Sequence, residues 1–130
     1  MSNSKVKIGN VSGTIENMLR EYGEEIRKDL DRVIPDVAKD TAKKVLENAR
    51  AEGLVRTGAY ARGWKTKVGK NLYGDVTATV YNAKAPGLPH LLEFGHAKRG
   101  GGRTKPAEHI KPAEEWAATE SVKRVKEAIG

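Results

Sequence analysis

The sequence predicts an α+β domain, because helix-like and strand-like hydrophobic spacings follow one another along a short chain. Apolar residues recur at intervals of three and four through residues 14–51 and again through residues 113–129. Between these stretches, residues 64–81 show the two-residue alternation of a β-hairpin. The chain has 130 residues and no linker between separate parts, so we expect a single domain over residues 1–130.

The first helical stretch carries two apolar stripes, the second of which lies roughly 120° further round the helix. The first stripe consists of Ile15, Leu19, Tyr22, Ile26, Leu30, Val33 and Val37, and the second of Ala42, Val45, Leu46 and Ala49. Pro35 lies between them, and a proline ring removes one backbone hydrogen bond and crowds the preceding turn. We therefore expect a long kinked helix, or two helices that meet near Ile34–Pro35. Residues 1–12 are expected to form a flexible N-terminal arm.

The centre of the chain predicts a turn and then an antiparallel hairpin. Residues 56–60, Arg-Thr-Gly-Ala-Tyr, are expected to turn into a short helical or irregular piece. Trp64, Thr66 and Val68 alternate with lysines, and Val76, Ala78 and Val80 alternate with Thr77, Thr79 and Tyr81. This alternation is typical of two half-exposed strands joined by the turn at residues 69–75.

The last third of the chain predicts a short helix, a loop and a terminal helix. Pro89 suits the first turn of a helix over residues 88–94, and Gly95 suits its end. Residues 95–107 hold four glycines, four basic residues and one proline, and we expect a mobile basic loop there. Pro112 is expected to open the terminal helix. Its predicted core face consists of Ala118, Val122, Val125 and Ile129, with Trp116 on nearly the opposite side.

Composition points to a thin core in a protein that is not exported. Hydrophobic residues make up 38% of the chain, and it has two Trp and one Phe. Contact with other copies would complete such a core. The chain has no cysteine, which excludes disulfides and thiolate chemistry. No apolar run approaches the roughly 18 residues of a membrane span, and Met1 to Asn10 lacks an apolar signal core. We therefore expect a soluble protein.

The positive charge is concentrated in the middle of the chain. The net charge is +7, and residues 51–112 hold eleven basic and four acidic side chains, whereas residues 1–50 hold ten and nine. A basic middle suggests an acidic partner, either nucleic acid or an acidic protein surface. The plain alternative is that the charge serves solubility alone.

The segment from His90 to His96 is the best candidate for an enzyme or metal site, with His109 further on. Zinc-protease helices place two histidines four residues apart, whereas these two are six apart and Gly95 breaks the helix between them. We therefore expect no catalytic residue, metal or cofactor. In the structural alternative Leu91, Leu92 and Phe94 pack, Glu93 forms a helix cap or salt bridge, and His96 lies at the mouth of the loop.

The glycine-rich loop does not match a nucleotide-binding loop, which ends in Gly-Lys-Ser or Gly-Lys-Thr after a strand. Its basic residues are possible contacts to phosphate or to an acidic partner: Lys98, Arg99, Arg103 and Lys105. Single-strand recognition usually adds aromatic stacking, and this loop has no aromatic residue. The alternative is a solvated loop that orders against a neighbouring subunit.

The order of these motifs resembles the small neck or tail-completion proteins of lambdoid and related long-tailed bacteriophages. The matching segments are residues 56–60 after a long amphipathic helix, Val80-Tyr81-Asn82 at the end of the hairpin, residues 91–96 (Leu-Leu-Glu-Phe-Gly-His) before a glycine-rich loop, and residues 109–113 (His-Ile-Lys-Pro-Ala) before a terminal helix. The resemblance covers residues 14–130, and residues 91–96 contribute most to it.

The resemblance implies a ring-forming component of the head–tail junction in the virion, assembled in the host cytoplasm, with no catalysis and no cofactor. Its expected partners are further copies of the chain and the connector, tail-terminator or tail-tube proteins. The family's basic loop varies, so the loop charges carry no inherited role. The candidate interface residues are Thr57, Gly58, Leu91, Leu92, Glu93, Phe94, Gly95, His96 and Trp116. The alternative functions are a basic nucleic-acid-binding module and a metal-dependent enzyme at His90, Glu93 and His96.

Overall fold

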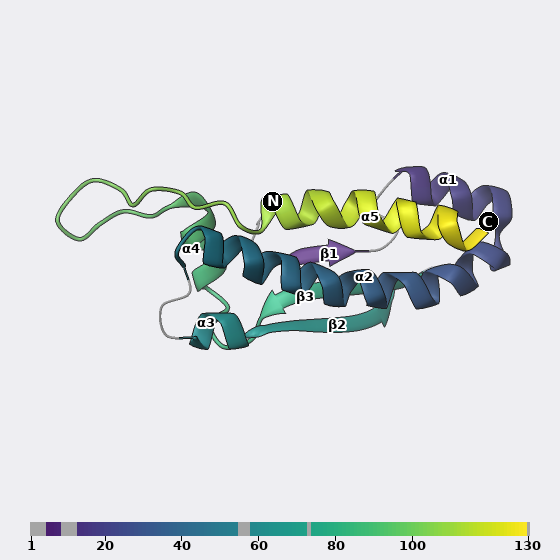
Figure 1. Cartoon of the computed structure of the whole chain (residues 1–130), viewed down its shortest axis with the longest axis horizontal. Coiled ribbons are helices and arrows are strands. Elements are labelled where there is room, and N and C mark those ends of the chain that lie inside the picture. The colour runs from purple at the N-terminus through teal and green to yellow at the C-terminus, as the bar shows by residue number, and fades with distance from the viewer. Residues whose placement is uncertain (1–4, 9–12, 55–57, 73, 130) are drawn as a thin grey trace.

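The structure is a computed structural model that describes residues 5–8, 13–54, 58–72 and 74–129. Its elements in chain order are β1 (Val6–Ile8), α1 (Gly13–Tyr22), α2 (Glu24–Ala51), α3 (Ala59–Arg62), β2 (Trp64–Lys70), β3 (Val76–Asn82), α4 (Leu88–Phe94) and α5 (Lys111–Ile129). The two long helices α2 and α5 pack against each other and against a small antiparallel sheet (Figure 1). The predicted α+β class is therefore confirmed.

The N-terminal helical region divides at Gly23 and not at the predicted position near Ile34–Pro35. Gly23 has a φ of 59°, which favours glycine, and its N–H donates to the carbonyl of Leu19 at 2.9 Å. Helix α2 continues through Pro35 without a break. The helix tolerates this proline because the residues around it, Val33 to Ala38, bury an apolar face on the sheet and on α5.

The sheet contains one strand that the sequence analysis missed. The strand order is β1-β3-β2, and β1 pairs antiparallel with β3 through Val6 opposite Val80 and Ile8 opposite Ala78. The predicted flexible arm over residues 1–12 is therefore wrong for Val6–Ile8, whose two apolar side chains are buried. The predicted hairpin of β2 and β3 is present, with Trp64 opposite Asn82 and Lys70 opposite Val76.

The core lies between the two long helices and one face of the sheet. Helix α2 contacts β3 and β2, and α5 contacts β1. The stripe of α2 does not shift after Pro35, because the buried Thr41 continues it from Val37 to Val45. The hydroxyl of Thr41 donates to the carbonyl of Val37 at 2.7 Å, so a polar side chain fits a close helix contact without an unsatisfied group.

Helix α5 turns a different face to the core than the one predicted. Its buried residues are Ala113, Ala117, Ser121 and Val125. Ala118 is exposed and Ile129 is 42% exposed, so two of the four predicted core positions are wrong. Ser121 explains the error, because its hydroxyl donates to the carbonyl of Ala117 at 2.7 Å and this satisfies it inside the apolar stripe.

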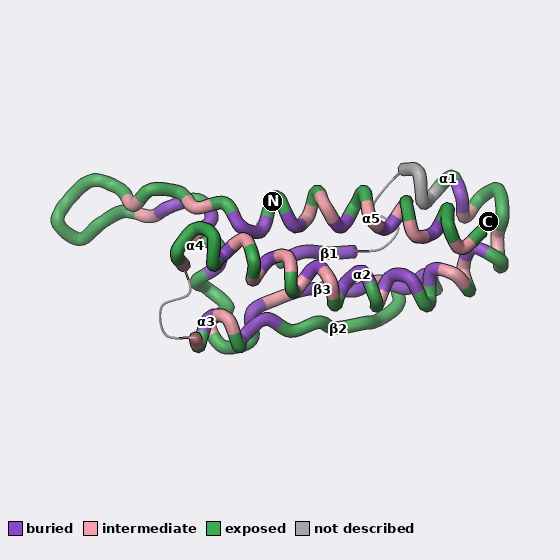
Figure 2. The backbone as a smooth tube through the Cα atoms, viewed as in Figure 1, coloured by how far each residue is buried: buried purple, intermediate pink, exposed green. Residues whose placement is uncertain are grey.

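Residues 95–107 form a narrow paired arm that extends past α4 and away from the rest of the molecule (Figure 1). The N–H of Thr104 donates to His96 at 2.8 Å, and Ala97 and Arg103 form an isolated bridge. The N–H of Lys98 donates to Gly102 at 2.9 Å. Most of the arm is exposed (Figure 2). The mobility expected of this segment stays a prediction.

Candidate functional site

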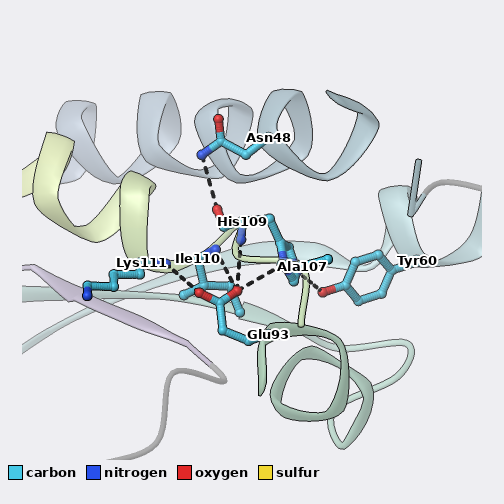
Figure 3. A network of polar contacts seen from close by, with 7 residues as sticks. All are labelled: Asn48, Tyr60, Glu93, Ala107, His109, Ile110 and Lys111. Carbon is cyan, nitrogen blue, oxygen red and sulfur yellow. Dashed lines mark hydrogen bonds and ion pairs between the residues drawn. The ribbon is translucent and has the colours of Figure 1, made fainter. Parts of the chain in front are cut away.

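Glu93 caps the first turn of α5 from a neighbouring helix. Its side chain is buried, and its carboxylate accepts hydrogen bonds from the backbone N–H groups of His109, Ile110 and Lys111, each at 2.9 Å (Figure 3). The first N–H groups of a helix have no partner within the helix and favour a negative charge. The expected cap or salt bridge at Glu93 is therefore confirmed, and it ties α4 to α5 across the intervening loop.

The imidazole of His109 extends this network to α3. Its Nδ1 lies 3.0 Å from Glu93 Oε1 and 3.0 Å from the carbonyl oxygen of Ala107. Since both partners are acceptors, we assign the proton to Nδ1. The other ring nitrogen, Nε2, lies 2.5 Å from the hydroxyl of Tyr60 and accepts its hydrogen bond (Figure 3). Asn48 of α2 donates to the carbonyl of His109 at 3.1 Å, so four separate segments meet here.

The electrostatics of the network favour a charged carboxylate and a neutral phenol. Burial by itself would raise the pKa of Glu93, but the hydrogen bonds from the His109 side chain and from the three backbone N–H groups lower it to about 2. Burial, reinforced by the negative charge of Glu93, raises the pKa of Tyr60 well above its ordinary value. Tyr60 is therefore a poor nucleophile, and the arrangement is better suited to hold these four segments together than to activate a hydroxyl.

Asn82 makes a second buried junction, at the end of the hairpin. Its amide donates to the carbonyl of Tyr60 at 2.8 Å, and its side-chain oxygen accepts from the N–H groups of Lys84 and Ala85. A Cβ atom on Gly63 would lie 2.2 Å from that oxygen, so position 63 requires glycine. Asn82 therefore fixes the end of β3 against α3 and the start of the segment that leads to α4.

Gly95 lets the two sides of the arm approach each other closely. It is buried with φ 76° and ψ 170°, a conformation that only glycine adopts readily, and an added Cβ would lie 2.5 Å from the carbonyl oxygen of Thr104. Next to it, the N–H of His96 donates to the Thr104 hydroxyl at 2.8 Å. His96 therefore lies at the mouth of the arm, as expected.

Comparison with known protein families places most of these residues in one family of bacteriophage proteins. A family profile described as "Bacteriophage HK97-gp10, putative tail-component" matches residues 13–95. The chain belongs to this HK97-gp10-like family. The protein is thus a bacteriophage tail component, a class that forms part of the virion, and the resemblance to phage tail proteins is confirmed at this level. No curated protein and no solved structure matches the chain.

The family match ends where the Glu93 network crosses to the last helix. Tyr60, Asn82, Glu93 and Gly95 lie within the matched region, whereas His109 lies beyond it. The bonds from Glu93 to the backbone of α5 therefore connect the part of the chain that the HK97-gp10-like profile covers to the part that it does not.

Helix α4 exposes a row of apolar side chains beside the arm. Leu88 is 36%, Leu91 40% and Phe94 41% exposed, and they recur every three residues along one side of the helix. The expectation that Leu91 and Phe94 pack in the interior is wrong, whereas Leu92 does pack against the core. The reason is that Glu93 faces inward to cap α5, which turns positions 91 and 94 outward.

The other predicted interface residues lie in different places. Thr57 lies outside the described residues. Gly58 precedes α3 with a φ of 81°, as the expected turn requires. Trp116 does not lie under the basic loop: it packs half-buried against α2, with the Lys44 ammonium 5.4 Å and the Arg124 guanidinium 5.9 Å from its ring centroid. Arg124 in turn pairs with Asp40 at 2.7 Å, which fixes this contact between α2 and α5.

The basic side chains of the arm point to no buried site, since all four are exposed. Lys98, Arg99, Arg103 and Lys105 are all exposed, and Arg103 donates to the carbonyl of Gly95 at 3.2 Å. In the part of the chain that the structure describes, no group of three or more His, Asp or Glu residues could hold a metal ion, and no helix is long and apolar enough to cross a bilayer. The candidate metal residues separate, because the exposed His90 ring lies tilted against the Phe94 ring at a centroid distance of 4.9 Å, whereas Glu93 is buried.

Sequence reasoning missed Tyr60, Asn82 and His109 as a connected set. The available signal was their chemistry: an aromatic hydroxyl in a predicted turn, an amide at the predicted end of the hairpin, and an imidazole between the predicted loop and the terminal helix. Nothing in their spacing of 22 and 49 positions indicated that they meet.

Proposed function

We propose that this tail component acts in the phage neck, at the head–tail junction, as a tail-completion protein. Its copies pack side by side into a ring that docks to the connector on one side and to tail proteins on the other. Closed rings arise when head-to-tail contacts between identical subunits rotate back onto themselves. The protein works by assembly, and its histidines take part in no reaction.

The exposed apolar row on α4 is the observation that carries this proposal. Leu88, Leu91 and Phe94 lie at intervals of three on one short helix, next to the projecting arm. Grouped exposed apolar side chains of this kind mark protein contact sites, whereas isolated ones are common. Neighbouring subunits in a ring would cover this row, and the arm of residues 95–107 would reach over the next copy.

The opposite end of the molecule offers a surface for the other side of such a contact. The turn between β2 and β3 lies far from α4 (Figure 1), and it carries Leu72, which is fully exposed. Tyr22 and Ile129, at the ends of α1 and α5, are also more than two-fifths exposed. An elongated subunit with apolar residues at both ends suits head-to-tail packing.

The enclosed Tyr60–His109–Glu93 network supports a structural role over a catalytic one. The three side chains are at most 5% exposed, so a substrate has no access to them. Three of the four hydrogen bonds that Glu93 accepts come from backbone N–H groups. Because backbone amides do not exchange protons with a substrate, these bonds stabilise the fold and do not assist proton transfer.

The test is light scattering on the purified chain combined with complementation of a phage that lacks the gene. The wild type should form concentration-dependent oligomers that electron microscopy shows as rings. The double variant Leu91→Ser/Phe94→Ser should stay monomeric and should not restore infectious particles. Val68→Ser is the matched control, since Val68 is 51% exposed but lies on β2. Normal rings and normal complementation by the double variant would overturn the proposal, as would a strictly monomeric wild type whose gene is dispensable for tails.

A further inference from the structure

The sheet turns a lysine-rich face away from the two long helices. Thr79 lies at the centre of β3, with Lys7 of β1 opposite it on one side and Lys67 of β2 on the other. Lys65 lies beside Tyr81 in the next row of the same face. Since side chains two positions apart in a strand share a face, Thr77, Thr79 and Tyr81 alternate with the buried Val76, Ala78 and Val80.

This lysine face is exposed and carries no compensating acid. The lysines on it are exposed, and the three β3 residues between them are half-exposed. None of the three described strands contains an Asp or Glu, and no ion pair involves these lysines within the described ranges. A hollow of about 520 Å³ opens on this face, lined by Lys5, Lys67, Thr79, Tyr81, Asn82 and Pro86.

We propose that the lysine face, formed by Lys5, Lys7, Lys65 and Lys67 around Thr79 and Tyr81, binds the phosphate backbone of duplex DNA without reading its sequence. The strands hold the lysines about 7 to 10 Å apart, so several phosphates of one duplex are within reach together. Lysine ammonium groups and threonine and tyrosine hydroxyls are typical phosphate contacts.

Two features favour DNA over an acidic protein as the ligand. Lysine is depleted in protein interfaces, which are built around aromatic and other apolar anchors, and this face has only Tyr81 of that kind. The apolar row on α4 has the chemistry expected of a protein contact, so the two surfaces differ in kind.

The lysine face offers few groups that could read the DNA sequence. The three described strands contain no Arg or Gln, and their one Asn, Asn82, is buried. The face therefore exposes no guanidinium or amide group to base edges.

The lysine face is a better phosphate site than the basic arm of residues 95–107. Pairing within the sheet fixes the backbone positions of Lys7, Lys65 and Lys67 relative to one another, so the backbone loses little conformational freedom on binding. In the arm, by contrast, the Arg103 guanidinium already donates to the Gly95 carbonyl. The proposal does not depend on ring formation, because every copy carries the complete face.

The test measures fluorescence anisotropy of a labelled duplex of arbitrary sequence with the full chain. Lys65→Ala/Lys67→Ala should weaken binding about tenfold or more at low salt and reduce the slope of log affinity against log salt by about 2. The matched control is Lys39→Ala/Lys43→Ala, which removes the same charge from exposed positions on α2 and should change affinity less than about twofold. Lys98→Ala/Arg99→Ala in the arm should likewise change it little.

Three results would overturn the proposal: no duplex binding at low salt, equal losses in the sheet and α2 variants, or displacement of the duplex by polyglutamate as efficiently as by unlabelled duplex. Light scattering on Lys65→Ala/Lys67→Ala separates this proposal from the ring. If this variant keeps its oligomers but loses DNA binding, the lysine face is a DNA site separate from the subunit contacts. If it loses its oligomers, the lysine face is not a separate DNA site, and the proposal fails.

Discussion

The imidazole Nδ1 of His109 lies 3.0 Å from the Oε1 atom of Glu93, and both side chains are completely buried. The two residues are 16 positions apart, on either side of the projecting arm. Their contact closes the base of the arm and holds the start of α5 against α4. The proposed contacts of α4 and the arm with neighbouring copies would need a rigid base, and this buried pair is suited to form it.

Replacement of Glu93 should therefore be among the most destabilising single changes in the chain. Glu93→Ala leaves the N–H groups of His109, Ile110 and Lys111 without their acceptor inside the protein. We expect the free energy of unfolding to fall by about 3–5 kcal/mol, because each buried donor left without a partner costs about 1–3 kcal/mol. Urea denaturation measures this. Glu108→Ala is the control, because Glu108 is exposed in the same segment and should cost less than about 0.5 kcal/mol.

Glu93 should also make the fold sensitive to acid. The pKa of Glu93 is about 2 in the folded chain against an ordinary 4.5, so the folded state binds fewer protons than the unfolded state between these values. The carboxylate's contribution is complete above pH 4.5 and is lost as the pH falls towards 2. Its size is about 3 kcal/mol.

The measurement for this pH dependence is a series of urea denaturations of the wild type and Glu93→Gln across that range. Other carboxylates titrate in both proteins, so the difference between the two curves isolates Glu93. The gap in unfolding free energy should narrow as the pH falls below 4.5. A gap that stays constant would show that Glu93 is not held as a carboxylate.

The parts of the fold that sequence predicted well are those set by local patterns. The hairpin follows from alternation in Val76 to Asn82, and the short helix from Pro89 and Gly95 at its two ends. Strand β1 was missed, because a three-residue strand has too few positions to show a period, and Val6 and Ile8 are buried only once β3 lies beside them.

The errors in the helices have tertiary causes. Pro35 seemed to be the break in the first helix, but packing on the sheet outweighs the single lost hydrogen bond, whereas Gly23 stops the helix through its positive φ. The face of α5 was misjudged because Ser121 looked polar and is satisfied within its own helix.

The sequence predicted the role of Glu93 in the candidate site but not the residues that it contacts. A cap or salt bridge at Glu93 was among the alternatives, but its partners follow a 13-residue arm whose path no pattern determines. The outward position of Leu91 and Phe94 depends on the inward position of Glu93, so it too required the fold.

The ionisation of the Tyr60 hydroxyl should show whether the buried network with His109 and Glu93 is intact. Burial and the charge of Glu93 keep the Tyr60 pKa above its ordinary 10.0, so the folded state holds a proton that the unfolded state loses. The contribution of the protonated Tyr60 hydroxyl to the free energy of unfolding is complete below pH 10 and declines as the pH rises above 10. Ultraviolet titration of tyrosinate should show one of the four tyrosines ionising late or only on unfolding, and Tyr60→Phe should remove that step.

At neutral pH, Tyr60→Phe should lower the free energy of unfolding by about 1–3 kcal/mol, because Nε2 of His109 is left buried without a partner. Tyr81→Phe is the matched control. Tyr81 is half-exposed on the lysine face, and the same loss of a hydroxyl there should have little effect on stability. Equal costs for the two variants would mean that the Tyr60–His109 hydrogen bond adds nothing specific.

Gly95 should be the glycine of the arm that tolerates substitution least. Gly95→Ala forces a φ of 76° with a ψ of 170° on a residue that avoids this region, which costs of order 1–3 kcal/mol, and its Cβ would collide with the carbonyl oxygen of Thr104. We expect a clear drop in melting temperature in thermal denaturation. Gly100→Ala, at an open position with nothing within 4 Å, should leave it nearly unchanged. If both alanine variants lowered the melting temperature equally little, the close approach of Gly95 to Thr104 would not be needed to close the arm. The rigid base of the arm would then have to lie elsewhere.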